Sequence, residues 1–240
     1  MILIDGKKVA ADIRSELKDK TSQLKAEGKN VPGLVAIIVG EDPASQIYVA
    51  SKGKACEEIG MRTKTEKLSA DISEAELLSL IQSYNQNKDY HGILVQLPLP
   101  KHINEDKVIE TISHKKDVDG FHPISVGNLV IGKDTFASCT PAGIQELLIR
   151  YKIETKGKHV VVVGRSNIVG KPIANIMLQK AEGANSIVTI VHSAAKDISY
   201  YTKQADILIA AIGKAEMIKA DMVKDGVAVI DVGINRIDDP

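Results

Sequence analysis

The chain has 240 residues, of which 44% are hydrophobic and 26% charged, the balance of a globular rather than a disordered protein. Its 31 Lys and Arg residues equal its 31 Asp and Glu residues, and it contains no Trp. This composition argues against a nucleic-acid partner, which needs excess basic charge or aromatic stacking platforms. No apolar run approaches the roughly 18 residues of a membrane helix. The N-terminus is too polar for a signal peptide, and Cys56 and Cys139 lie far apart and outside any C-x-x-C pattern, so we expect a cytoplasmic protein with no membrane partner.

In the first half of the chain, strand-like and helix-like segments alternate. Three runs predict strands, the first and third buried and the second more exposed: 34–39, 62–68 and 92–97. Asp42 and Pro43 predict the N-cap and first residue of a helix that ends near Ile59. Ser73 and Glu76 form a capping box that predicts a second helix.

The second half repeats the alternation from Thr140 and Pro141, again a predicted N-cap followed by proline. A helix is expected over 169–180, and strands are expected at 159–163, 186–191, 206–211 and 227–231. Repeated β-α-β order predicts parallel sheets covered by helices. We therefore predict an α/β protein of two α/β domains, residues 1–139 and 140–240, the second a Rossmann-like parallel sheet, with a cleft between them as the active site.

A glycine-containing turn, G-R-S-N-I-V-G, lies between a predicted strand and a predicted helix at 164–170. In that context, backbone N–H groups and the helix dipole suit a pyrophosphate. Ser166 stands where a dinucleotide fingerprint has its second glycine, so a tight turn without a ligand remains an alternative. A serine-hydrolase nucleophile elbow would need glycine at the position of Ile168.

The end of the following strand bears on the choice of cofactor. NAD enzymes place a carboxylate there to bind the ribose hydroxyls. Here the strand is followed by His192 and Ser193. These side chains and Arg165 can hydrogen-bond a 2′-phosphate, so the pattern favours NADP. For His192 alone, an exposed loop position is the alternative.

In the first half, Tyr48 and Lys52 are four residues apart and share one helix face with Ser45, one turn earlier. The start of this helix follows a buried strand and so lies near the carboxyl edge of the sheet, where ligands bind. The alternative is a solvated helix face. Gln96 lies in a predicted buried strand, where its amide needs hydrogen-bond partners.

Asp117 and Asp119 share a K-D-V-D-G loop. An Asx turn is the alternative for either residue. A calcium loop is excluded, because its twelfth position is Asn128 rather than a bidentate Glu.

Six segments spread over nearly the whole chain carry a family resemblance. They are S-Q-I-Y-V-A-S-K (45–52), G-I-L-V-Q-L-P-L-P (92–100), K-D-V-D-G-F-H-P (116–123), C-T-P-A-G (139–143), G-R-S-N-I-V-G-K-P (164–172) and V-I-D-V-G-I-N-R (229–236). Together they resemble the bifunctional methylenetetrahydrofolate dehydrogenase/methenyltetrahydrofolate cyclohydrolase family.

The resemblance implies that Lys52 is the catalytic lysine, that Tyr48 packs along the folate, and that Gln96 holds and tunes Lys52. Asp119 is implied to bind the pterin, because its two oxygens match the paired N–H donors of an aminopyrimidinone. Substrate-binding residues are expected at Tyr48, Ser45, Gln96, Pro98 and Asp119. Cofactor-binding residues are expected at Gly164, Arg165, Ser166, Val169, Gly170, His192, Ser193, Gly213 and Ile234.

The implied chemistry has two steps, with NADP as cofactor, a folate substrate and a homodimeric enzyme. Hydride leaves methylenetetrahydrofolate for NADP, and water then opens the methenyl product to formyltetrahydrofolate. The chemistry that the resemblance implies requires no metal, and we expect no metal site. The chain departs from the family at Ser125, usually Asn, and at Ala195, usually Thr. In the family, a strand, a loop and a helix follow the position of Pro240, and the resemblance implies that they wall the nicotinamide pocket.

Two other functions remain open at this point. One is a family member with only the dehydrogenase activity, using NAD, which Tyr48, Lys52 and Gln96 argue against. The other is a non-catalytic nucleotide-sensing module on the same fold. Such a module would have no reason to keep Lys52 and Asp119.

Overall fold

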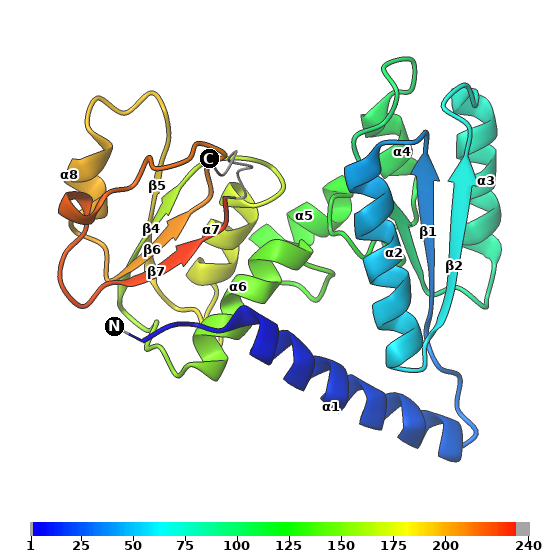
Figure 1. Ribbon diagram of the computed structural model, residues 1–240, viewed down its shortest axis with the longest axis horizontal. Coiled ribbons are helices and arrows are strands. Elements are labelled where there is room, and N and C mark those ends of the chain that lie inside the picture. Colours follow the sequence, from blue (N-terminus) through cyan, green and yellow to red (C-terminus); the bar gives the residue numbers. More distant parts are fainter. Residues whose placement is uncertain (1, 234–240) are drawn as a thin grey trace, which may run out of the picture. The chain divides into compact units, whose positions relative to one another are not determined.

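The computed structural model describes residues 2–233 and consists of two compact units, Leu3–Ser125 and the chain from Val126 onward (Figure 1). Each unit has its own parallel sheet, as the β-α-β order predicts. The division after Ser125 falls inside α5 (Pro123–Val130), whereas the predicted domain boundary is at residue 139. Among the described residues, no helix is both long and apolar enough to cross a membrane.

The first sheet has the strand order β2-β1-β3, formed by β1 (Gly33–Val39), β2 (Arg62–Leu68) and β3 (Gly92–Val95). Alternate residues of a strand point to opposite faces. On one face, Val35 and Ile37 pack with α3 (Glu74–Gln86) and α4 (Glu105–Thr111). On the other face, Ala36 and Ile38 pack with Val49 of α2 (Pro43–Glu58). The central strand is therefore buried on both sides, as its apolar run predicts.

The predicted starts of α2 and α3 are confirmed. The Asp42 carboxylate accepts a hydrogen bond from the Ser45 N–H at 3.3 Å, and Pro43 begins the helix. Ser73 and Glu76 form the capping box of α3. β3 ends at Val95, earlier than predicted, although the Gln96 N–H still donates to Ile37 O at 2.9 Å.

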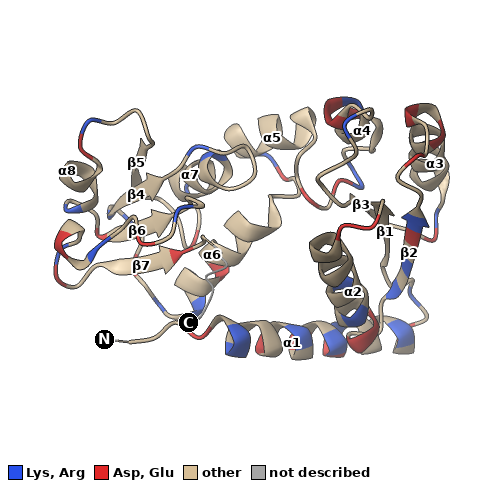
Figure 2. Ribbon diagram, turned by 45° about the horizontal axis from the view of Figure 1, so that its top comes forward, with Lys and Arg blue, Asp and Glu red and all other residues tan. Residues whose placement is uncertain are grey.

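One long helix, α1 (Gly6–Ala26), is absent from the sequence prediction. Only Val9 and Thr21 of its residues are buried, and Lys and Arg alternate along it with Asp and Glu (Figure 2). Such a helix has no wide apolar stripe to reveal it. It is held at the end of α2, where the Thr21 hydroxyl donates to Ile59 O.

The second sheet has the strand order β5-β4-β6-β7, formed by β4 (His159–Val163), β5 (Ile187–Val191), β6 (Ile207–Ala210) and β7 (Ala228–Asp231). All four strands agree with the predicted segments to within one residue at each end. The helix α7 (Gly170–Leu178) packs on β4, β5 and α6 (Cys139–Arg150). Ile198 of α8 (Ile198–Thr202) packs against a cluster that includes Val161 and Val163, near the short helix η1 (Ala220–Met222).

The predicted N-cap at Thr140 is wrong. α6 begins at Cys139, with Ser138 at the N-cap position, and Pro141 lies within the first turn. Proline is tolerated there because the first N–H groups of a helix have no intrahelical partner. The Ser138 hydroxyl donates instead to Ile168 O at 2.7 Å, which ties the start of α6 to the turn before α7.

Candidate functional site

Lys52 and Gln96 are brought together at the carboxyl edge of the first sheet. Lys52 lies on α2 and is half-buried, and its Nζ donates to Gln96 Oε1 at 3.4 Å. Gln96 follows β3, and its Nε2 donates to Leu97 O at 2.8 Å. The second bond orients the amide so that its oxygen faces Lys52. The expectation that Gln96 finds hydrogen-bond partners is therefore confirmed, although its side chain is half-buried rather than fully buried.

The other predicted residues of the α2 face differ in exposure. Tyr48, one turn before Lys52, is 52% exposed, so about half of its surface is open to a ligand. Ser45 is only 6% exposed, and its hydroxyl donates to the Asp42 carboxylate at 3.4 Å. Ser45 therefore belongs to the helix cap rather than to an open face with Tyr48. Pro98, after β3, is exposed.

Asp119 is half-buried, and no described residue makes a hydrogen bond to its carboxylate. Burial raises the pKa of this carboxyl group above its ordinary value. The Lys52 ammonium lowers the pKa, and the nearby Asp117 carboxylate raises it. An acceptor partly removed from water and left without a donor is costly for the folded chain. Such a group is suited to a ligand that brings its own N–H donors.

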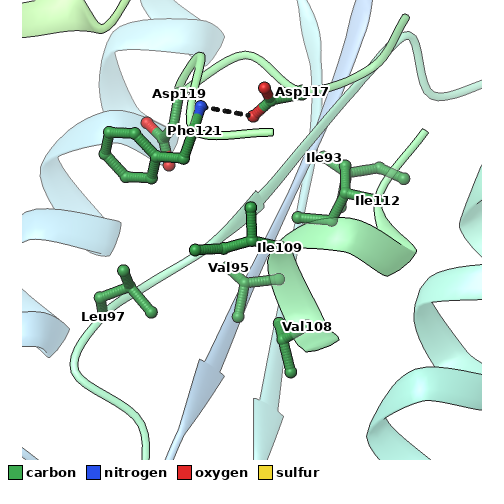
Figure 3. A pocket seen from close by; sticks show the side chains of 9 residues that line it. All are labelled: Ile93, Val95, Leu97, Val108, Ile109, Ile112, Asp117, Asp119 and Phe121. Carbon is green, nitrogen blue, oxygen red and sulfur yellow. Dashed lines mark hydrogen bonds between the residues drawn. The ribbon is translucent and has the colours of Figure 1, made fainter. Parts of the chain in front are cut away.

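A pocket in the first unit has apolar walls and two carboxylates (Figure 3). Its lining comes from β3 and the chain just after it, from α4 and its C-cap, and from the K-D-V-D-G loop and the residue that follows it: Ile93, Val95, Leu97, Val108, Ile109, Ile112, Asp117, Asp119 and Phe121. Phe121 is missing from the sequence prediction. Its position directly after the loop that holds Asp119 was the available signal. The cavity volume of the pocket is only about 10 Å³, room for about one water, so this pocket by itself is too small for a folate.

In the second unit, the turn after β4 packs backbone against backbone. Gly164 has φ +125°, and a Cβ added there would collide with Ala211 O. A Cβ added at Gly170 would collide with Gly164 O. Both glycines are therefore required by the close approach of the chain, as in strand-to-helix turns that hold a dinucleotide.

Ser166 has a structural role in this turn. Its hydroxyl accepts from the N–H of Val169 at 3.1 Å and from that of Gly170 at 3.3 Å. A serine here satisfies donors at the start of α7 that would otherwise lack a partner. This explains why serine replaces the expected second glycine.

The other predicted cofactor residues lie at the carboxyl edge of the second sheet. β5 adjoins β4, and the Gly164 N–H donates to Val191 O at 2.7 Å, so Arg165 and His192 follow neighbouring strand ends. His192 Nδ1 accepts from Ala194 N at 3.3 Å, and both Arg165 and Ser193 are exposed. Gly213 follows β6 and faces open space. Ile234 lies outside the described residues.

These residues fit a phosphate-bearing dinucleotide. The turn leaves no room for side chains at Gly164 and Gly170, while open space remains at Gly213. The five residues after β5, H-S-A-A-K, include no carboxylate that would repel a 2′-phosphate. The donor set of an arginine, a histidine and a hydroxyl matches that phosphate.

Gly164→Ala is expected to destabilise the protein by more than about 1 kcal/mol, because the new Cβ combines a positive φ with a backbone collision. Gly213→Ala is the matched control, since its Cβ would meet nothing within 4 Å. Thermal unfolding of both variants measures the difference. Equal melting temperatures for the two variants would contradict the packing described for this turn.

Comparison with known proteins matches both halves of the chain. Residues 4–119 match the catalytic domain of tetrahydrofolate dehydrogenase/cyclohydrolase, and residues 138–240 match its NAD(P)-binding domain. A relative from Chlorobium limicola, Bifunctional protein FolD, is 62% identical over 242 residues, which span 100% of this chain and 82% of the relative.

Solved structures of the same family are also similar to this chain. The bifunctional enzyme FolD from Campylobacter jejuni has a TM-score of 0.94 and 49% identity, over 99% of this chain and 83% of that one. The Trypanosoma brucei methylenetetrahydrofolate dehydrogenase-cyclohydrolase, solved with NADP cofactor and an inhibitor, has a TM-score of 0.92 and 35% identity, over 100% of this chain and 81% of that one. With both domain types matched in order and close relatives along its whole length, the chain belongs to the tetrahydrofolate dehydrogenase/cyclohydrolase family.

Proposed function

We propose that this chain oxidises 5,10-methylenetetrahydrofolate to 5,10-methenyltetrahydrofolate with NADP and hydrolyses the product to 10-formyltetrahydrofolate. Family membership supports both activities. The observation that carries the proposal is the hydrogen bond from Lys52 to Gln96. The same unit contains the Asp119 carboxylate, which accepts no hydrogen bond from a described residue. A nucleotide-sensing module would need neither feature.

The folate is held by the first unit. The exposed ring of Tyr48 packs along the substrate, and Pro98, after β3, contributes apolar surface. The Asp119 carboxylate accepts the paired N–H donors of the pterin, which give it hydrogen bonds that no residue in the described part of the chain provides. Ser45 acts through the cap that holds the start of α2.

In the first reaction, a C–H bond of the methylene bridge breaks, and its electron pair leaves as hydride, so that the folate becomes a methenyl cation. When bound, NADP supplies the hydride acceptor. The turn at 164–170 receives the pyrophosphate at the start of α7. Arg165, His192 and Ser193 bind the 2′-phosphate.

In the second reaction, water attacks the methenyl carbon, and the bond from this carbon to N5 breaks. Both protons of the attacking water must leave as its oxygen becomes the formyl carbonyl: one reaches N5 as that bond breaks, and the other is released to the solvent. Lys52 performs these transfers as general base and then general acid. Gln96 fixes the position of the lysine through its amide oxygen.

One assay tests this proposal against its alternatives. The chain is given methylenetetrahydrofolate with NADP or with NAD, and NADPH and methenyl absorbance are followed separately. We expect NADPH to form and the methenyl compound to disappear. Persistent methenyl absorbance would indicate a dehydrogenase without hydrolase activity, and binding without turnover would indicate a sensor.

Arg165→Ala is expected to raise the apparent KM for NADP far more than that for NAD. A charge-assisted hydrogen bond to the 2′-phosphate contributes about 1.5–3 kcal/mol, or roughly 10- to 150-fold in affinity. The comparison of the two cofactors in one variant is its own control. Equal losses for both cofactors would mean that Arg165 does not bind the phosphate.

We also propose the domain limits, the oligomeric state and the compartment. The folate domain spans residues 1–139 and the NADP domain residues 140–240, supported by the two family matches.

The chain forms a homodimer in the cytoplasm. β5 is an edge strand with Ile187 and Ile190 exposed, and an apolar edge favours a second copy. Light scattering in solution measures the mass.

A further inference from the structure

Two carboxylates two residues apart have opposite environments in the first unit. Asp117 is 3% exposed and lies in a parallel bridge with Ile93 of β3, while the Ile93 N–H donates to Lys116 O at 2.8 Å. The loop therefore starts as an extension beside β3 and runs in the same direction. The chain turns directly after Asp117, where the Gly120 N–H donates to Asp117 O at 3.2 Å, and Asp119 lies in this turn.

The Asp117 carboxylate is fully engaged with the segment that follows it. Oδ1 accepts from the Phe121 N–H at 3.3 Å (Figure 3), and Oδ2 accepts from the His122 N–H at 2.9 Å and from the Ser125 hydroxyl at 2.7 Å. These donors lie four, five and eight residues beyond Asp117. The network is thus wider than the two-residue span of the Asx turn considered from the sequence.

Val118 anchors the loop between the two carboxylates. It packs against the cluster that contains Ala36 and Leu94, and a Cβ added at Gly92 would lie 2.6 Å from its Cγ1. Beyond Asp119, the chain turns at Gly120, which has φ +67°. Asp119 therefore lies between an apolar anchor on one side and the hydrogen bonds of Asp117 on the other.

We propose that Asp117 is a positioning residue, which holds the Asp119 carboxylate in place for the folate with Ser125 as its hydroxyl partner. This inference rests on the proposed function, because it assumes that Asp119 binds the substrate. Asp117 itself is buried and already accepts three hydrogen bonds from the chain, so it does not contact the folate. It affects folate binding by fixing the conformation of the loop that carries Asp119. Ser125 stands where the family usually has Asn, and an Asn amide can donate the same hydrogen bond.

Asp117→Asn removes the charge and keeps an oxygen that can accept from His122 and Ser125. We expect it to raise the KM for methylenetetrahydrofolate by about tenfold, the effect of weakening charged hydrogen bonds. The kcat and the KM for NADP should change by less than about twofold, since a change in KM alone marks lost substrate binding. Ser125→Ala should act in the same direction with a smaller effect, and Ser125→Asn should retain the wild-type KM.

A double-mutant cycle distinguishes positioning from a general structural role. In an Asp119→Asn background, adding Asp117→Asn should change the KM for the folate by less than about twofold, because the group that Asp117 positions is already lost. Equal effects of Asp117→Asn in both backgrounds would overturn the inference, and so would an unchanged KM in the single variant. If Asp117→Asn does not fold, the same cycle with Ser125→Ala decides the question by the same outcomes.

The wild-type assay separates this inference from the proposed function. A wild-type chain that turns over the folate while every Asp117 and Ser125 variant keeps its KM overturns only the positioning role. A wild-type chain with neither activity overturns the proposed function, and the positioning role with it.

Discussion

Lys52→Met is expected to lower the hydrolysis of methenyltetrahydrofolate by about 10²–10⁴-fold, the usual contribution of a positioned acid or base. Methionine keeps much of the apolar stem of lysine but has no titratable amine. The contact with Gln96 Oε1 is lost at the same time. Hydride transfer should suffer less, because the cofactor supplies the redox chemistry. Methenyltetrahydrofolate should therefore accumulate during dehydrogenase turnover.

Lys54→Met is the matched control, since Lys54 is exposed on the same helix. It should keep both activities. The measurement is methenyl absorbance, with the methenyl compound given directly and then formed from the methylene substrate. If a folded Lys52→Met variant hydrolyses the methenyl substrate at the wild-type rate, Lys52 is a residue of a solvated helix face.

Asp119→Asn is expected to weaken folate binding by about tenfold or more. The amide keeps the size of the carboxylate but loses the charge and one acceptor, so one of two paired hydrogen bonds to the pterin is lost. The KM for NADP should stay unchanged, because the predicted cofactor residues belong to the other unit. Direct titration with the folate substrate gives the loss in affinity.

The same substitution should leave thermal stability equal or higher at neutral pH. Burial raises the pKa of Asp119, so the folded state binds a proton more tightly than the unfolded state does. The free energy of unfolding therefore falls as pH rises from the ordinary carboxyl pKa to the raised one. Asparagine carries no charge, so the free energy of unfolding of the Asn variant does not fall in this way. The variant is therefore more stable than the wild type above the raised pKa, and this difference in stability disappears as the solution is acidified.

Asp71→Asn, at an exposed loop position, is the control for this pH dependence and should show no such advantage. Melting temperatures at several pH values test the sign. A marked loss of stability in Asp119→Asn would mean that Asp119 holds the turn together, which is the structural role considered from the sequence.

The sequence by itself determined the class of fold, the strands and the family. β1 and the four valines of β4 are apolar runs, the pattern typical of strands that are buried on both faces. The starts of α2 and α3 follow from Asp42, Pro43 and Ser73, because capping depends on residues within three or four positions. Tyr48 and Lys52 could be placed on one helix face by spacing alone.

Only the tertiary structure decided which polar side chains have hydrogen-bond partners. The contact of Lys52 with Gln96 joins residues 44 apart in the chain, and α1 is fixed where Thr21 meets Ile59, 38 residues away. Asp117 and Asp119 share one loop motif, yet the Asp117 carboxylate accepts three hydrogen bonds and the Asp119 carboxylate accepts none from residues 2–233. Spacing along the chain predicts local geometry. The burial and partners of a side chain depend on segments that only the folded chain brings together.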